Sequence, residues 1–132
     1  MQKTFYTKLK DQCKITDSRL CIGLDIDYTL LPDNFSKTIV GMFDFIKVII
    51  DSTTDICVAY KLNMGFFEQF GYKGYELMEK TVSYIDGRNI TIADGKRGDI
   101  GNSSKMYAKS IFNQIGFDSA TISPYMGMDS VL

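Results

Sequence analysis

The chain has 132 residues, of which 45% are hydrophobic and 23% charged, with 15 basic and 16 acidic side chains. This composition is that of a globular protein, and it excludes a disordered chain and a collagen-like fibre. The balanced charge, without a long block of one sign, argues against a nucleic-acid or anionic-membrane partner. The length predicts that residues 1–132 form a single domain with no internal boundary.

The amino-terminal sequence and the cysteines both predict a cytoplasmic protein. The first residues, MQKTFYTKLKDQ, are too polar for a signal peptide, and the apolar stretches are too short to cross a bilayer. The three cysteines stand in apolar contexts, which favours buried, reduced thiols over disulfides. The sequence contains no histidine, so we expect no bound metal and no histidine-dependent nucleophile.

Helix and strand patterns alternate along the chain. The spacing of Phe5, Leu9 and Cys13 predicts a short amphipathic helix at the start. Four short apolar runs then predict buried strands at residues 20–25, 56–61, 90–94 and 119–123. The segments between these strands carry apolar residues at helical spacing, and Asn102 or Ser103 is expected to cap the third of these helices.

The spacing of the strands predicts a parallel sheet. Their starts lie 36, 34 and 29 residues apart, which is the length of a βα unit. Right-handed crossovers would make such a sheet parallel. A closed (βα)8 barrel takes about 250 residues. The pattern therefore fits either a small open α/β sheet or the first half of a barrel.

Charged residues stand where the predicted strands end. Asp25 closes the first strand, Lys61 closes the second, and Asp94 and Lys96 follow the third. The carboxyl ends of parallel strands meet at one edge. The two-residue period places these four side chains on one face, provided that the extended chain continues through Gly95. An array of alternating sign suits a reaction through a carbanion, since a lysine can protonate it and an aspartate can stand against a carboxylate.

Each of these features also has a purely structural interpretation. A lone charged residue at a strand end is usually a solvated turn residue or one partner of an ion pair. The segment KRGDIGNSS could be a glycine-rich turn that opens a helix, or a weak anion site. Four charges at three successive strand ends together favour a functional site.

Four segments resemble the bacterial branch of the orotidine 5′-phosphate decarboxylase family: GLDID, AYKLNMGFFE, IADGKRGDIGNSSKMYA and ISPYMGMDS. The resemblance covers residues 18–132. It implies an α/β fold of the (βα)8 TIM-barrel family, with this chain supplying about the first four βα units. It also implies decarboxylation of orotidine monophosphate to uridine monophosphate, in de novo pyrimidine biosynthesis, without a cofactor.

The resemblance also implies roles for the four charged residues. Asp25 and Lys61 would hold ribose hydroxyls of the substrate, and Lys61 would belong to the catalytic charge array as well. Asp94 would face the departing carboxylate. Lys96 would protonate C6 of the pyrimidine.

The resemblance further implies a homodimer. Asp99, with the substrate-binding Ile100 beside it, would reach across the interface into the partner's site. In this family the phosphate clamp comes from the second half of the barrel, and these 132 residues contain no counterpart. The chain is therefore expected to be the amino-terminal half of the enzyme, with an incomplete site, and whether this half is active alone stays open at this point.

Two alternatives remain open at this point. A sugar-phosphate decarboxylase or aldolase of the same superfamily would use magnesium, and that chemistry expects a carboxylate near the end of the second strand, where Lys61 stands. A non-catalytic half-barrel would instead persist by self-association through its open sheet edges.

Overall fold

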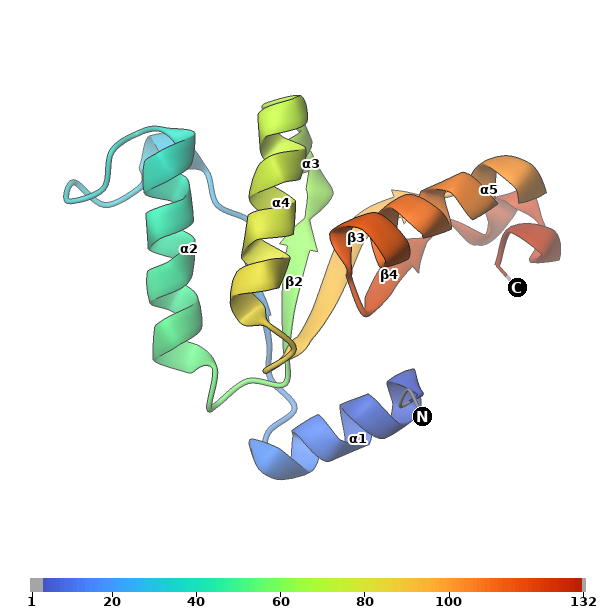
Figure 1. The fold of residues 1–132 in the computed structure, drawn as a ribbon, viewed down its shortest axis with the longest axis horizontal. Helices are drawn as coiled ribbons and strands as arrows, with labels where there is room; N and C mark the ends of the chain where they lie inside the picture. Colours follow the sequence, from blue (N-terminus) through green and yellow to red (C-terminus); the bar gives the residue numbers. More distant parts are fainter. Residues whose placement is uncertain (1–3, 132) are drawn as a thin grey trace.

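Four parallel strands lie side by side in chain order in the computed structural model, which describes residues 4–131 (Figure 1). They are β1 (Cys21–Gly23), β2 (Ala59–Asn63), β3 (Ile90–Arg97) and β4 (Ser119–Ile122). The register places Gly23 beside Lys61, Lys61 beside Ile92, and Ile92 beside Ser119. The predicted parallel sheet is therefore confirmed.

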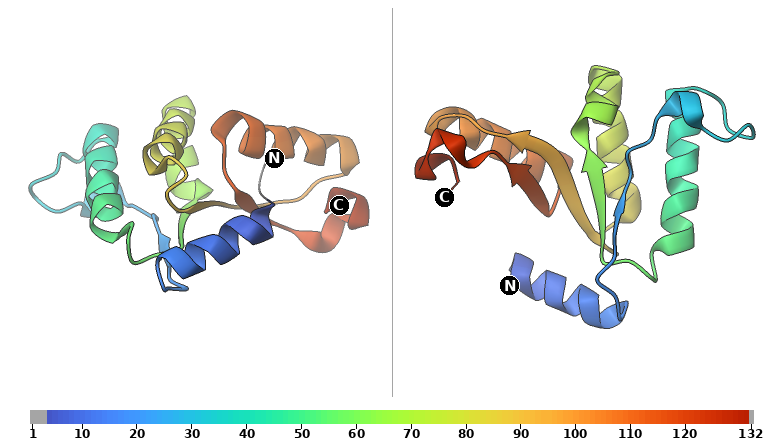
Figure 2. Two further views of the ribbon diagram at one scale, coloured as in Figure 1. Left: turned by 60° about the horizontal axis from the view of Figure 1, so that its bottom comes forward. Right: turned by 180° about the vertical axis from the view of Figure 1, so that it is seen from behind.

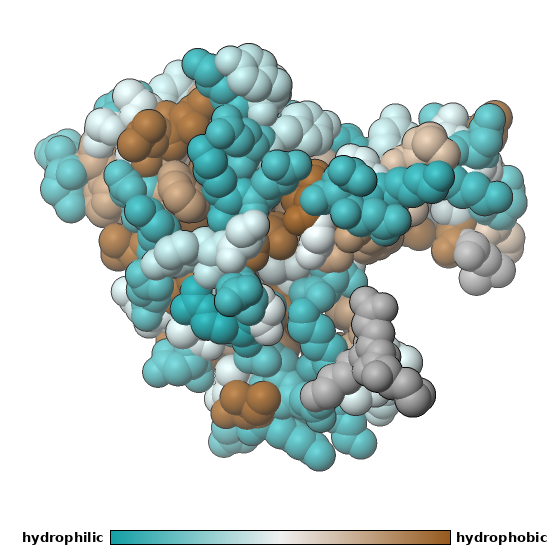
Figure 3. Space-filling model, in the orientation of Figure 1, coloured by the Kyte–Doolittle hydropathy of each residue, from teal (hydrophilic) through white to brown (hydrophobic). Residues whose placement is uncertain are grey.

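Helices cover one face of this sheet, which we call the outer face (Figures 1 and 2). They are α2 (Ile39–Thr53), α3 (Met64–Glu68), α4 (Tyr72–Ile85), α5 (Gly101–Ala108) and the π-helical continuation of α5, η2 (Lys109–Ile115). The core beneath them includes several side chains with no solvent exposure: Leu24, Met42, Ile46, Ile50, Tyr60, Leu62, Phe67 and Met78. In the view of Figure 3, polar side chains predominate over this layer, and apolar side chains gather over the upper part of α2.

The first helix, α1 (Phe5–Ile15), lies on the opposite, inner face of the sheet (Figure 2, left). Its Leu9 and Cys13 pack against a small cluster of buried residues at the amino ends of the central strands: Val58, Ala59 and Ile90. The ammonium group of Lys8 lies 2.5 Å from Oδ1 of Asp118, just before β4. The helix thus covers the inner face at one end and leaves the carboxyl ends of the strands open.

Short turns of 3-10 helix complete the chain. These are η1 (Tyr28–Leu30), η3 (Pro124–Met126) and η4 (Met128–Ser130). None of the helices within residues 4–131 has both the length and the apolarity that crossing a bilayer requires.

Some local predictions were wrong. The second strand begins three residues later than expected, because Ile56 and Cys57 donate their amides to Thr53 in the turn that closes α2. Helix α5 is capped by Ile100, without a side-chain bond, so neither Asn102 nor Ser103 is its cap.

The prediction that the cysteines are buried is wrong for Cys21. Cys57 is buried and Cys13 partly buried, but Cys21 is exposed. Cys21 lies on β1, an edge strand with a neighbour on one side only, so less of the chain covers it. All three are free thiols.

Candidate active site

The four predicted charged residues come together at the carboxyl end of the inner face. Lys61 lies on β2, and its ammonium group is 3.0 Å from Oδ2 of Asp94 on β3 and 3.6 Å from Oδ1 of Asp25. The ammonium group of Lys96 is 2.7 Å from the other oxygen of Asp94, Oδ1. We call this continuous line of alternating charges, Asp25–Lys61–Asp94–Lys96, the charge array.

Asp94 is the buried member of the charge array. Its side chain is only 10% exposed, whereas the side chain of Lys96 is 69% exposed. Hydrogen bonds, first from Lys96, then from Lys61 and from the hydroxyl of Thr121, hold the pKa of Asp94 well below its usual range. Asp94 is therefore a carboxylate at neutral pH.

Lys61 is held in its charged form by the two carboxylates that flank it. Burial lowers the pKa of Lys61, but the hydrogen bond to Asp94 and the negative charges of Asp25 and Asp94 outweigh that effect, so that the pKa is raised. The ammonium group thus stays charged between two carboxylates, and the array carries fixed, alternating charges.

Lys96 reaches Asp94 by a route that differs from the predicted one. The sheet has an irregularity between Ala93 and Arg97, and Lys96 adopts a left-handed conformation with φ of 48°. The strand continues through Gly95 as expected, and it is Lys96 itself that leaves the extended conformation. The turn in the backbone nevertheless brings the ammonium group of Lys96 onto the carboxylate of Asp94.

Thr121 on β4 is a member of this site that the sequence analysis missed. Its hydroxyl donates to Oδ1 of Asp94 at 2.8 Å and accepts the backbone amide of Lys96 at 3.0 Å. The available signal was the alternation of Ser119, Thr121 and Ser123 with Ala120 and Ile122, which puts three hydroxyls on one face of the strand.

Asp99 and Ile100 lie outside the charge array. They follow β3 in the segment that leads into α5, and Oδ1 of Asp99 accepts the backbone amide of Ile100 at 2.7 Å. Within residues 4–131, Asp99 forms no ion pair, and the Ile100 side chain is 57% exposed. Within one chain, and among residues 4–131, Asp99 and Ile100 therefore form no hydrogen bond or ion pair with the four residues of the charge array.

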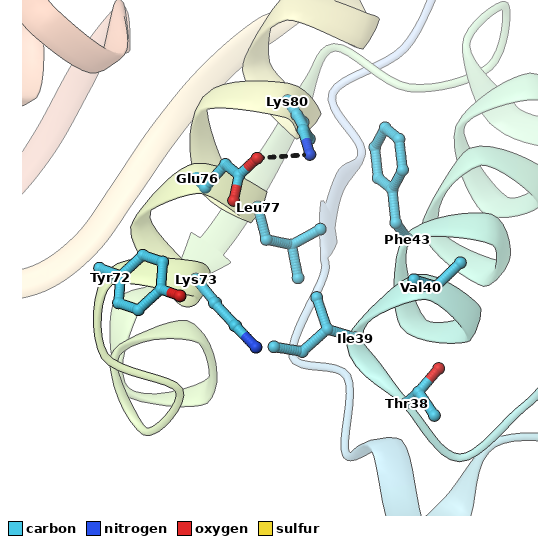
Figure 4. A pocket seen from close by; sticks show the side chains of 9 residues that line it. All are labelled: Thr38, Ile39, Val40, Phe43, Tyr72, Lys73, Glu76, Leu77 and Lys80. Carbon is cyan, nitrogen blue, oxygen red and sulfur yellow. Dashed lines mark ion pairs between the residues drawn. The ribbon is translucent and has the colours of Figure 1, made fainter.

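One other feature of the surface is separate from the charge array. A cavity of about 630 Å³ lies on the outer face between α2 and α4, where Glu76 and Lys80 form an ion pair of 2.7 Å (Figure 4). None of the array residues lines it. Among the described residues, no three Cys, Asp or Glu side chains are grouped so that they could hold a metal ion.

The comparison with known proteins agrees with this geometry. A sequence model of the orotidine 5'-phosphate decarboxylase / HUMPS family matches residues 18–132. The chain belongs to this family. The resemblance predicted from four sequence segments is thereby confirmed.

Individual relatives give the extent of the similarity. The orotidine 5'-phosphate decarboxylase of Flavobacterium johnsoniae is 48% identical over 127 residues, which are 94% of this chain and 46% of that protein. The protein of the same name from Bacteroides fragilis is 47% identical over 126 residues, 93% of this chain and 46% of its own length. The chain therefore spans slightly less than half the length of these curated relatives.

Solved structures show the same relation in three dimensions. The Leishmania donovani OMP decarboxylase superposes with a TM-score of 0.82 and 32% identity, covering 98% of this chain and 48% of that one. The Leishmania donovani UMP synthase superposes with a TM-score of 0.85 and 31% identity, covering 98% of this chain and 27% of that one. The predicted fold class is confirmed: the four parallel strands and their helices form half of a TIM-barrel architecture.

Proposed function

We propose that this protein is an orotidine 5′-phosphate decarboxylase, which converts orotidine monophosphate to uridine monophosphate and carbon dioxide. The observation that carries the proposal is the charge array, in which Lys61 and Lys96 alternate with Asp25 and Asp94 at the open end of the sheet. Curated relatives of 47–48% identity bear the name of this activity.

The reaction breaks the bond between C6 of the pyrimidine and its carboxylate. The electron pair of that bond stays on C6, and carbon dioxide leaves. The ammonium group of Lys96 then gives a proton to C6, and the neutral amine regains a proton from water. The exposure of Lys96 supports this role, because its ammonium group is open to a ligand on the side away from Asp94.

The remaining members of the charge array hold the substrate. Asp94 faces the carboxylate that leaves, while Asp25 and Lys61 bind the ribose hydroxyls. Fixed charges suit a reaction in which negative charge moves from a carboxylate to a carbon atom, since no dipole has to reorient as it proceeds. The charge array itself supplies the acid and the electrostatic stabilisation, so the proposed mechanism needs no cofactor.

The protein acts as a cytoplasmic homodimer in this proposal. Asp99 and Ile100 of each chain reach into the partner's site, which agrees with the exposed position of Ile100 and with the lack of an ion pair for Asp99 among residues 4–131. The three free thiols agree with a reducing compartment.

The test is the decrease in ultraviolet absorbance of orotidine monophosphate, with and without EDTA. It uses this chain alone and this chain joined to the remaining segment of the Flavobacterium johnsoniae relative, because the chain covers only 46% of that protein. We expect turnover that EDTA leaves unchanged. Turnover abolished by EDTA would favour a magnesium-dependent sugar-phosphate enzyme of the superfamily. No turnover in either form would favour a non-catalytic half-barrel.

A further inference from the structure

We propose that Thr121 is the positioning residue that holds Lys96 and Asp94 in their reactive arrangement. This inference rests on the proposed decarboxylation, in which those two residues act on the substrate. Thr121 lies on β4, and neither of the two residues it joins is on that strand. It therefore links the reacting pair to a second strand of the sheet.

The hydroxyl of Thr121 has both its donor and its acceptor roles assigned. It accepts the backbone amide of Lys96 at 3.0 Å and lies 2.8 Å from Oδ1 of Asp94. A hydroxyl carries a single hydrogen, and an amide can only donate. The hydrogen of Thr121 is therefore left for Asp94, and an ionised carboxylate is the form that accepts it best.

The bond to the amide of Lys96 falls where the sheet is irregular. Regular pairing of β3 with β4 stops at Ala93 and resumes at Arg97, so the amide of Lys96 takes a side-chain partner. Lys96 there has a left-handed backbone with φ of 48°, a conformation that residues other than glycine adopt only where their surroundings impose it. Thr121 is one of the contacts that impose it.

The Thr121 hydroxyl and the Lys96 ammonium group bind the same oxygen of Asp94. Oδ1 of Asp94 receives the hydroxyl of Thr121 and the ammonium group of Lys96, whereas Oδ2 receives Lys61. Thr121 thus contacts the carboxylate of Asp94 and the backbone of Lys96 through a single atom.

The test compares Thr121→Val, which keeps the shape without the hydroxyl, with Thr121→Ser, which keeps the hydroxyl. Two quantities are measured: hydrogen exchange of the Lys96 amide, and kcat and KM for orotidine monophosphate in the joined form described above. In Thr121→Val we expect exchange about 10-fold faster, from loss of one hydrogen bond. We expect kcat to fall about 10- to 100-fold, with KM within about threefold of wild type, because misplacement of a reacting group affects mainly the chemical step.

Thr121→Ser should resemble the wild type in both measurements, which a role in packing alone would not produce. Unchanged exchange of the Lys96 amide in Thr121→Val, or an unchanged kcat, would overturn the proposal. A wild type without turnover would contradict the proposed function instead. The exchange comparison would then still decide whether Thr121 holds Lys96.

Discussion

The two faces of the sheet use neighbouring residues of the same strand for different purposes. On β2, Tyr60 and Leu62 have no solvent exposure and pack under the outer helices, whereas Lys61 between them is 30% exposed on the inner face. Apolar packing on one face stabilises the fold, and fixed charges on the other supply the proposed chemistry. Stability and activity should therefore respond separately to substitutions on the two faces.

Asp94→Asn should have the largest combined effect on turnover and stability, because Asp94 is the one buried charge among residues 4–131. Turnover of orotidine monophosphate should fall at least about 100-fold, since the array loses its central charge. The free energy of unfolding should fall by about 1–3 kcal/mol, since Lys61 and Lys96 lose a charged partner. Kinetics and urea unfolding measure the two effects.

Asp44→Asn is the matched control for that substitution. Asp44 pairs with Lys47 at 2.9 Å on the surface of α2, and its side chain is 50% exposed. Its removal should change the unfolding free energy by less than about 1 kcal/mol and leave turnover unchanged. Equal losses in the two variants would contradict a special role for the inner face.

Ile46→Ala tests the outer face. Ile46 lies on α2 with no solvent exposure, so its truncation should lower the free energy of unfolding by about 2–5 kcal/mol. The kcat of the folded protein should stay within about twofold of wild type, because the charge array lies on the other face. Val48→Ala on the same helix is the control: Val48 is 50% exposed, and its loss should cost no more than about 0.5 kcal/mol. A large fall in kcat for Ile46→Ala would show that the two faces are coupled.

Acid should remove the contribution of Asp94 to stability. Its pKa in the folded protein lies well below the ordinary value of about 3.9, so its stabilisation is complete above that value and is lost as the pH falls towards the folded pKa. In urea unfolding between pH 3 and 7, the gap between wild type and Asp94→Asn should be constant above about pH 5 and shrink below about pH 4. A gap that grows as the pH falls would contradict this sign.

The sequence predicted the elements and the charge array because both depend on local periodicity. Apolar residues at helical spacing located α2 and α4, and the alternation along the strands put Asp25, Lys61 and Asp94 on one face. Such patterns can be recognised within a single segment of the sequence, without knowing which residues lie nearby in space.

The sequence did not predict features that arise between segments. The left-handed Lys96 follows from an irregular pairing of β3 with β4, and Thr121 enters the site through that pairing. The later start of β2 depends on amide bonds to the end of α2. Register is settled by contacts between distant residues, so the local pattern carried no signal for it. The turn at Thr53 is local, but the continuous apolar run that begins at Ile56 gave no sign that its first residues belong to the turn.

Lys96→Ala gives the most direct test of the central claim, that the charge array donates a proton to C6. Turnover of orotidine monophosphate should fall about 1,000-fold or more in this variant. The unfolding free energy should fall by only about 0.5–1 kcal/mol, because Asp94 loses one of its hydrogen bonds while the Lys96 side chain is 69% exposed. Lys73→Ala, at an exposed lysine of α4, should change neither quantity. Wild-type turnover in Lys96→Ala would contradict the account.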